Sequence, residues 1–159
     1  MKKNLLILTF AITMIIATVL TGCGKAKEDK NTSFSEAKAK SLITDLLDSK
    51  IFVDELSEID SKISLKQYDL DESKIKNILT YKGGGATAEE ITIIESEDED
   101  YINEKFDAYI ENQIKAYEEY MPAEVKKIKD YVKKSIGNYT IIVISDENSK
   151  VEEMIEKHE

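Results

Sequence analysis

Length, composition and charge already restrict what this chain can do. Its 159 residues carry a formal net charge of −10, and all 22 basic residues are lysine. Proteins that bind nucleic acids present basic surfaces and use arginine for bidentate phosphate contacts, so nucleic acid is not an expected partner. Cys23 is the only cysteine, which excludes a disulfide within one chain.

The first 22 residues are typical of a secretory signal peptide. Lys2 and Lys3 give the chain a positive start, and the uncharged residues 5–20 follow. This stretch of about 16 residues is shorter than the roughly 20 that cross a bilayer comfortably as a helix, which favours cleavage. The alternative is an uncleaved signal anchor, since a slightly short span is possible.

Leu20, Thr21, Gly22 and Cys23 resemble the lipobox of bacterial lipoproteins. The resemblance implies that a diacylglyceryl group alkylates the Cys23 thiol and that a peptidase cuts between Gly22 and Cys23. Two acyl chains hold a protein stably on a membrane, whereas one holds it only marginally. Removal of residues 1–22 takes away two lysines and no acid, so the mature charge becomes −12, which anionic headgroups repel. We therefore expect lipid anchoring at the extracytoplasmic face of the cell membrane.

The mature chain divides into a tether and one domain. Residues 23–32 comprise the lipidated cysteine and a polar segment without a large apolar side chain, which indicates a flexible tether. Residues 33–159 are long enough to bury a core without disulfides, so we expect a single domain there.

The first element of the domain is predicted to be a helix over residues 34–49. Ser33 and Glu36 have the spacing of a capping box. One helical face would carry four apolar side chains, Leu42, Ile43, Leu46 and Leu47. The following segment, residues 51–70, fits either a helix or a partial strand, and the sequence leaves the choice open.

Two short apolar runs then predict a β-hairpin. Residues 75–82 and 90–95 are rich in isoleucine, threonine and tyrosine, which favour strands. Gly83, Gly84 and Gly85 lie between them and permit a turn. A phosphate-binding loop is the alternative for these glycines, but such a loop ends in Gly-Lys-Ser/Thr and leads into a helix rather than a strand.

Residues 96–121 give the clearest helix pattern. Ser96 and Glu99 form a second possible capping box, and acidic side chains fill the first turn, where the helix dipole favours them. An apolar stripe follows at helical spacing: Ile102, Phe106, Ile110, Ile114, Tyr117 and Met121.

The remaining residues predict a second long helix, a strand and a last helix. Pro122 would begin a helix that continues to Gly137 as its C-terminal glycine, with an apolar face of Val125, Ile128, Val132 and Ile136. Residues 139–145 are apolar on both faces, which predicts an interior strand. Residues 146–159 close with a short helix. The element order predicts an α+β fold, with a small antiparallel or mixed sheet packed against amphipathic helices.

Three segments of the sequence are similar to a known family: YKGGGATAEEITII at 81–94, YMPAEVKKI at 120–128 and GNYTIIVISD at 137–146. With the lipobox, they resemble small lipoproteins of Gram-positive bacteria that carry a domain of unknown function. The resemblance implies a location and a fold, and it supplies no catalytic residues.

Side chains that could carry chemistry are few. The acidic residues 95–100 suggest calcium, but the EF-hand spacing is absent and helix capping explains them more simply. His158 is the only histidine and lies next to the end of the sequence, without a partner for a metal or a nucleophile. The sequence therefore predicts no metal site and no cofactor.

Two readings of the function follow. The first is a non-enzymatic binding or accessory protein of the cell envelope, with an envelope protein or a small ligand as partner. Four tyrosines, which would form either a binding face or the core edge, are relevant to it: Tyr109, Tyr117, Tyr120 and Tyr131. The alternative is a hydrolase of envelope polymers with paired carboxylates, for which Asp107 and Glu111 are four apart on one predicted helix.

Overall fold

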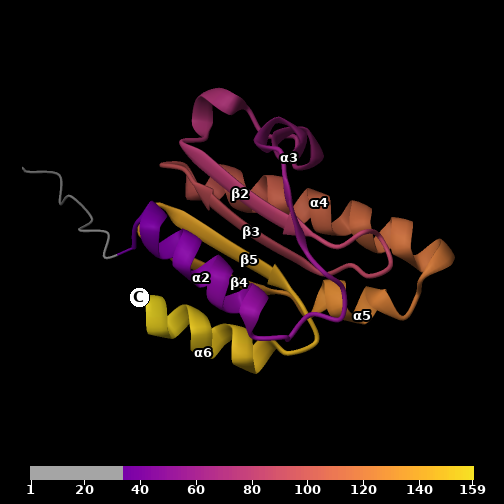
Figure 1. The fold of residues 1–159 in the computed structure, drawn as a ribbon. Coiled ribbons are helices and arrows are strands. Elements are labelled where there is room, and N and C mark those ends of the chain that lie inside the picture. Colours follow the sequence, from indigo (N-terminus) through magenta and orange to yellow (C-terminus); the bar gives the residue numbers. More distant parts are fainter. Residues whose placement is uncertain (1–33) are drawn as a thin grey trace, which may run out of the picture. The chain divides into compact units, whose positions relative to one another are not determined.

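A computed structural model describes residues 34–159 of the chain. The predicted signal peptide, the residues that resemble a lipobox, the predicted tether and Ser33 lie outside the described residues. The described part is an α+β domain with five α-helices and one five-stranded antiparallel sheet, as the sequence predicts (Figure 1). The sheet order is β1-β2-β3-β5-β4.

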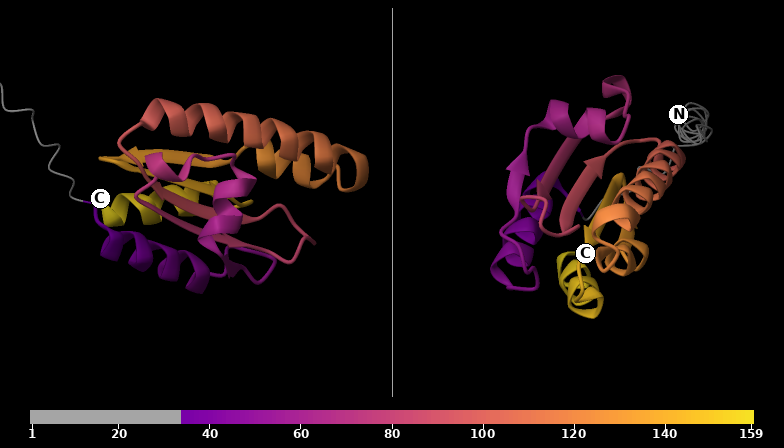
Figure 2. Two further views of the ribbon diagram at one scale, coloured as in Figure 1. Left: turned by 90° about the horizontal axis from the view of Figure 1, so that it is seen from above. Right: turned by 90° about the vertical axis from the view of Figure 1, so that its right-hand side faces the viewer.

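Helices cover both faces of the sheet (Figure 2). On one face lie α2 (Glu36–Asp48) and α6 (Asn148–His158), whose apolar side chains pack against Ile91, Ile93 and Ile141 of the sheet. On the other face lie α3 (Ser61–Gln67), α4 (Glu99–Tyr120) and α5 (Glu124–Lys129). Ile94, Ile142 and Ile144 belong to this second core.

The two central strands explain why the sheet has two buried faces. Strand β3 (Glu90–Glu95) and strand β5 (Tyr139–Ile144) are neighbours, and almost every side chain on them is buried. Because successive side chains in a strand alternate between faces, each of these strands contributes to both cores. The predicted interior position of residues 139–145 is confirmed.

The glycine-rich segment is a hairpin loop, as predicted. It joins β2 (Asn77–Lys82) to β3, and the two strands pair from Asn77 with Glu95 to Lys82 with Glu90. Residues 51–70, for which the sequence left helix and strand undecided, contain one of each. Strand β1 (Ser57–Ile59) is the short edge strand beside β2, and helix α3 follows it. A 3₁₀ turn, η1 (Glu72–Lys74), then leads into β2.

The prediction of one helix from Pro122 to Gly137 is wrong. Helix α5 ends at Lys129, and β4 (Val132–Ile136) forms a hairpin with β5. Gly137 has a φ of 64° in the two-residue turn of this hairpin, so it is not a helix cap. Val132 and Ile136 fit helical spacing with Val125 and Ile128, but their spacing of four also places them on one face of a strand.

Both predicted capping boxes are replaced by simpler caps. Helix α2 is capped by Ser35, whose hydroxyl accepts from the Lys38 amide at 3.4 Å. Helix α4 is capped by Asp98, whose carboxylate accepts from the Tyr101 amide at 3.1 Å. Ser96 instead accepts from the Asp98 amide at 3.1 Å, so it shapes the turn that precedes the helix.

Candidate functional site

The loop between β2 and β3 covers one end of the sheet and begins the candidate site. A Cβ atom at Gly83 would overlap the Asp54 carboxylate, whereas Gly84 has open space around it. Asp54 accepts a hydrogen bond from the Gly84 amide at 2.9 Å, which links the loop to the segment after α2. The absence of a side chain at Gly83 allows Asp54 to come this close. Gly85 has a φ of 95°, a conformation that favours glycine.

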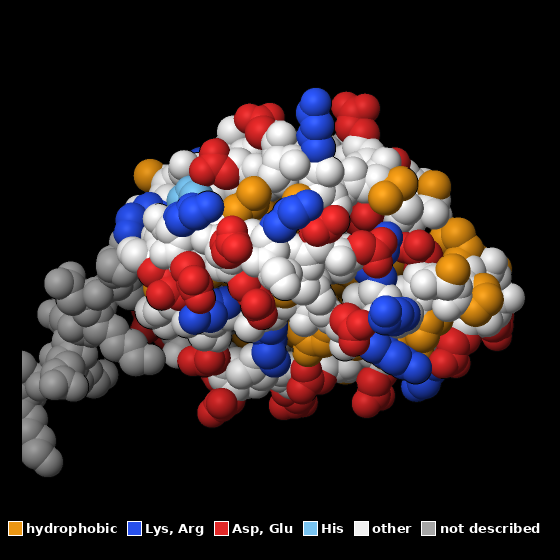
Figure 3. All heavy atoms as spheres, turned by 90° about the horizontal axis from the view of Figure 1, so that it is seen from below, with side chains coloured by type: hydrophobic (Ala, Val, Ile, Leu, Met, Phe, Trp, Pro, Cys, Tyr) orange, Lys and Arg blue, Asp and Glu red, His pale blue; other side chains and the backbone are white. Residues whose placement is uncertain are grey.

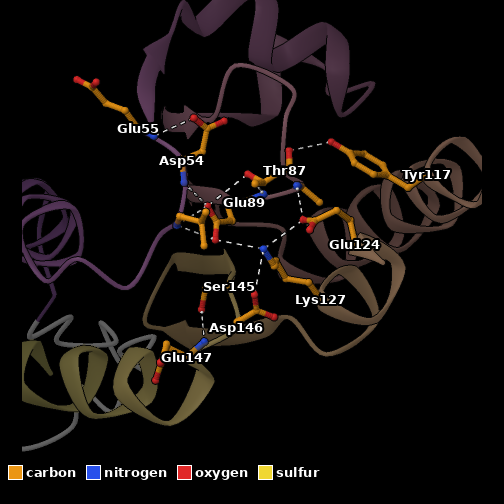
Figure 4. Close-up of polar contacts among 12 residues, drawn as sticks. Asp54, Glu55, Thr87, Glu89, Tyr117, Glu124, Lys127, Ser145, Asp146 and Glu147 are labelled. Atoms are coloured by element: carbon orange, nitrogen blue, oxygen red, sulfur yellow. Dashed lines mark hydrogen bonds and ion pairs between the residues drawn. The ribbon is translucent and has the colours of Figure 1, made fainter. Parts of the chain in front are cut away.

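Glu89, at the end of this loop, is the centre of a buried ionic cluster (Figure 4). Its side chain accepts from the backbone amides of Val53 and Asp54, each at 2.9 Å, and from the Lys127 ammonium at 3.2 Å. Lys127 also contacts carboxylate oxygens of Glu124 at 3.1 Å and Asp146 at 3.2 Å. We call Glu89, Lys127, Glu124 and Asp146 the Glu89 cluster.

The Glu89 cluster joins four segments that are far apart in the sequence: the segment after α2, the glycine loop, helix α5 and the residue Asp146 after β5. Glu89 and Lys127 are 1% and 5% exposed, so their charges are almost withdrawn from water. Burial lowers the pKa of Lys127, but hydrogen bonds to Glu124, Asp146 and Glu89 outweigh it, and the pKa is raised above its ordinary value. The ammonium is therefore fully charged at neutral pH, and it neutralises a carboxylate that would otherwise be costly to bury.

Glu90, the next residue, is the centre of a second buried cluster on the α4 side of the sheet. It pairs across the hairpin with Lys82, whose ammonium lies 2.9 Å from the Glu90 carboxylate. Tyr109 of α4 donates to Glu90 at 2.6 Å, Thr92 donates at 3.0 Å, and Tyr68 makes a further hydrogen bond. We call Glu90, Lys82, Tyr68, Tyr109 and Thr92 the Glu90 cluster.

The two phenols of the Glu90 cluster are held in the neutral form. Burial and the neighbouring Glu90 charge raise the pKa of Tyr68 and of Tyr109 well above the usual value of a phenol. Both rings therefore keep their protons and act as hydrogen-bond donors to the carboxylate. Tyr109 also receives a hydrogen bond from Lys82, whose ammonium lies 4.9 Å from the centre of its ring.

A cavity of about 300 Å³ lies between the glycine loop, β2 and α4. Glu89 and Glu90 line it, together with Lys82, Tyr109 and Tyr117. The Tyr117 hydroxyl donates to the carbonyl oxygen of Thr87 at 3.0 Å, which fixes this ring against the loop (Figure 4). Buried charged groups beside a cavity are the usual sign of a functional site.

A larger hollow of about 440 Å³ lies beside α3, but its chemistry is weaker. Its charged lining residues, Lys62, Lys66, Asp69 and Glu72, are all exposed to solvent. Charges in water interact weakly with a ligand because the solvent screens them. The cavity under the glycine loop is therefore the better candidate.

Comparison with known proteins identifies the domain that holds this cavity. The family model for a domain of unknown function, DUF4358, matches residues 50–145, which is more than half of the chain. The chain belongs to the DUF4358 family. No curated protein and no solved structure matches it. The matched region of the DUF4358 domain includes Glu89, Glu90, Lys82 and Lys127, and it begins after α2 and ends before α6.

The carboxylates singled out in the sequence do not lie at the cavity of the DUF4358 domain. Asp107 and Glu111 are exposed on α4, and neither lines the space under the glycine loop. Asp107 lies 3.8 Å from the Lys133 ammonium of the edge strand β4. In the structure these two residues are therefore surface residues of α4.

The four tyrosines have different environments. Tyr109 is buried in the Glu90 cluster, and Tyr131 packs edge-on against Phe106 with ring centres 5.3 Å apart. Tyr120 is 66% exposed and stacks on Tyr117 at 5.8 Å. Apolar side chains gather at the end of the molecule where α4 leads into α5, and acidic and basic side chains intersperse over the rest of this view (Figure 3). Tyr109 and Tyr131 thus belong to the core or its edge, whereas Tyr120 is a surface residue.

The acidic run and His158 have structural partners. Asp98 caps α4, Glu95 accepts from Asn138 and Tyr139 at 2.9 Å each, and Glu97 pairs with Lys76. His158 lies 3.1 Å from Asp45 of α2, which joins the ends of the two helices. Among residues 34–159, no group of three or more histidine, cysteine or acidic side chains is placed to hold a metal ion, and no helix is long and apolar enough to span a bilayer.

Apart from Tyr109, the residues of the two clusters were not singled out from the sequence, although a signal exists. Glu89 and Glu90 stand directly before the apolar strand residues 91–94. Two successive carboxylates at the start of a strand with two buried faces must point to opposite sides and become buried there. Lys82 ends the preceding strand, where the hairpin register places it opposite Glu90. Lys127 gives no comparable signal, because its role depends on where α5 packs.

Proposed function

We propose that this DUF4358 protein is a lipid-anchored lipoprotein at the extracytoplasmic face of the cell membrane of a Gram-positive bacterium. We further propose that its domain is a non-enzymatic binding or accessory protein of the cell envelope. The observation that carries the anchoring is the sequence Leu20-Thr21-Gly22-Cys23, which follows an apolar stretch too short for an ordinary span. The cavity under the glycine loop supports the binding role.

The chemistry of the Glu90 cluster favours binding over catalysis. General acid–base catalysis needs a group that exchanges its proton near the working pH. Tyr68 and Tyr109 have raised pKa values, with burial as the main cause, and so keep their protons. The Glu90 carboxylate accepts hydrogen bonds from Tyr109 and Thr92 and pairs with Lys82, so its oxygens are already engaged by the protein. A hydrolase would instead need a pair of carboxylates facing the substrate, and Asp107 and Glu111 do not line this cavity.

The anchoring proposal is tested by following the fate of Cys23. Cells that express the full chain are fed a clickable fatty acid, and the protein is examined for label, size and membrane fraction. The wild-type chain is expected to be labelled and shortened, and Cys23→Ser to remain an unlabelled full-length precursor. Thr21→Ser keeps a small hydroxylic residue before Gly22, so this control should mature normally. Normal maturation of Cys23→Ser would contradict the proposal.

A further inference from the structure

We propose that the cavity under the glycine loop binds a neutral saccharide, a ring or two of a larger glycan. This inference rests on the proposed binding role and gives it a ligand class. The first argument for a neutral ligand comes from the charges at the cavity. Lys82 is paired with Glu90 at 2.9 Å, and Glu89 with Lys127 at 3.2 Å, so each charged side chain that lines the cavity already has a partner of opposite charge. A charged ligand would disturb these buried pairs, whereas a neutral polar one leaves them intact.

The cavity also presents polar groups that the protein itself does not use. Gln67 of α3 and Gln113 of α4 both line it, and within the described part of the chain neither side-chain amide has a hydrogen-bond partner. Each amide offers two donors and an acceptor, which match neighbouring hydroxyl groups on a sugar ring. The Lys82 ammonium has three N–H donors, of which Glu90 and Tyr109 accept two, so one is left for a ligand oxygen.

The size and shape of the cavity favour a ring over an extended peptide. Its volume of about 300 Å³ lies at the small end of the range for ligand sites. Its polar side chains come from α3, α4, β2, β3 and the glycine loop, so they approach the space from several directions. An extended peptide would instead need a long free strand edge, and the neighbouring edge strand β1 has three residues. Tyr117 adds an apolar ring surface of the kind on which the C–H face of a sugar can lie.

The experiment measures binding of N,N′-diacetylchitobiose to the full chain in detergent micelles, by calorimetry and ligand-observed NMR. We expect saturable binding that changes little with salt, because the ligand is uncharged. Gln113→Ala removes one uncommitted amide, and we expect it to weaken binding about tenfold, the effect of one or two hydrogen bonds. Asn112→Ala removes an amide from the adjacent, exposed position of α4, outside the cavity lining, and should bind like the wild type.

Melting curves test whether both variants fold as the wild type does. If Gln113→Ala melts at a lower temperature, Gln67→Ala takes its place in the binding experiment. Tighter binding of deacetylated chitobiose, which is cationic, or of glucuronate, which is anionic, would overturn the inference. Binding of trialanine in place of the disaccharide would also overturn the saccharide inference, but it would support the proposed binding role of the domain. Failure of every probe would overturn the saccharide inference, while the labelling of Cys23 decides the anchoring separately.

Discussion

Replacing Lys127 by methionine tests whether the Glu89 cluster stabilises the folded domain around the cavity. Methionine keeps most of the volume of the lysine stem but removes the ammonium that lies 3.2 Å from Glu89. Glu89 is 1% exposed, and without Lys127 it keeps only neutral donors, the amides of Val53 and Asp54 foremost. Removal of one partner from a buried ion pair costs about 3–5 kcal/mol, a large part of the 5–15 kcal/mol that stabilises a typical domain.

We therefore expect Lys127→Met to lower the free energy of unfolding by about 3 kcal/mol, measured by urea denaturation at neutral pH. Lys129→Met on the same helix is the matched control, because Lys129 is exposed and lies 4.0 Å from Glu118, and it should change stability by less than about 0.5 kcal/mol. In the double variant Glu89→Gln/Lys127→Met the buried charge is gone, so the loss should be smaller than the sum of the single losses. Equal losses for Lys127→Met and Lys129→Met, or strict additivity in the double variant, would refute the reasoning.

Two further predictions concern the loop and the pH dependence. Gly83→Ala should destabilise the domain by about 1–2 kcal/mol, because its Cβ would displace Asp54 from the Gly84 amide. Gly84→Ala is the control, since Gly84 has open space around it, and thermal melting should show almost no change. Equal effects of the two substitutions would contradict the described loop packing. Burial and the hydrogen bond to Glu95 raise the pKa of Tyr139 to about 12. The folded domain thus keeps a proton that the unfolded chain loses near pH 10, so the stabilisation is complete below pH 10 and declines as the pH rises toward 12. NMR of ¹³C-labelled tyrosine should show a resonance that titrates near pH 12 and disappears in Tyr139→Phe; no such late resonance would count against this environment.

Much of the fold could be predicted because local patterns and tertiary packing agree. The apolar stripe of α4 and the two-sided apolar strand β5 need no knowledge of their neighbours to be recognised. Residues 122–137 show the limit of this reasoning. Val125, Ile128, Val132 and Ile136 satisfy two periodicities at once, and the edge position of β4 leaves Lys133 and Lys134 exposed, so the strand lacks clean alternation. The pair Gly137-Asn138 is the signal that distinguishes a hairpin from a helix end here, since such pairs are typical of hairpin turns.

The candidate site was harder to predict than the fold. Its buried charges come from segments far apart in the sequence, with Glu89 and Lys127 38 positions apart. A lysine or glutamate in a chain with 34% charged residues is normally exposed, so composition gives no reason to select these. Two features connect the sequence to the site directly: the position of Glu89 and Glu90 before the apolar strand, and the hairpin register that places Lys82 opposite Glu90.

Helix α2 determines how far the cavity can lie from an anchored Cys23. Its 13 residues span about 20 Å, and the segment after it brings the Val53 and Asp54 amides to Glu89 at the cavity. The residues 24–35 between Cys23 and this helix add at most about 40 Å of chain. If Cys23 carries the proposed lipid, the cavity can reach no farther than roughly 60 Å from the bilayer surface. Within such a layer a fixed glycan would be met at a high effective concentration, so a weak intrinsic affinity would be enough for the cavity to be occupied much of the time.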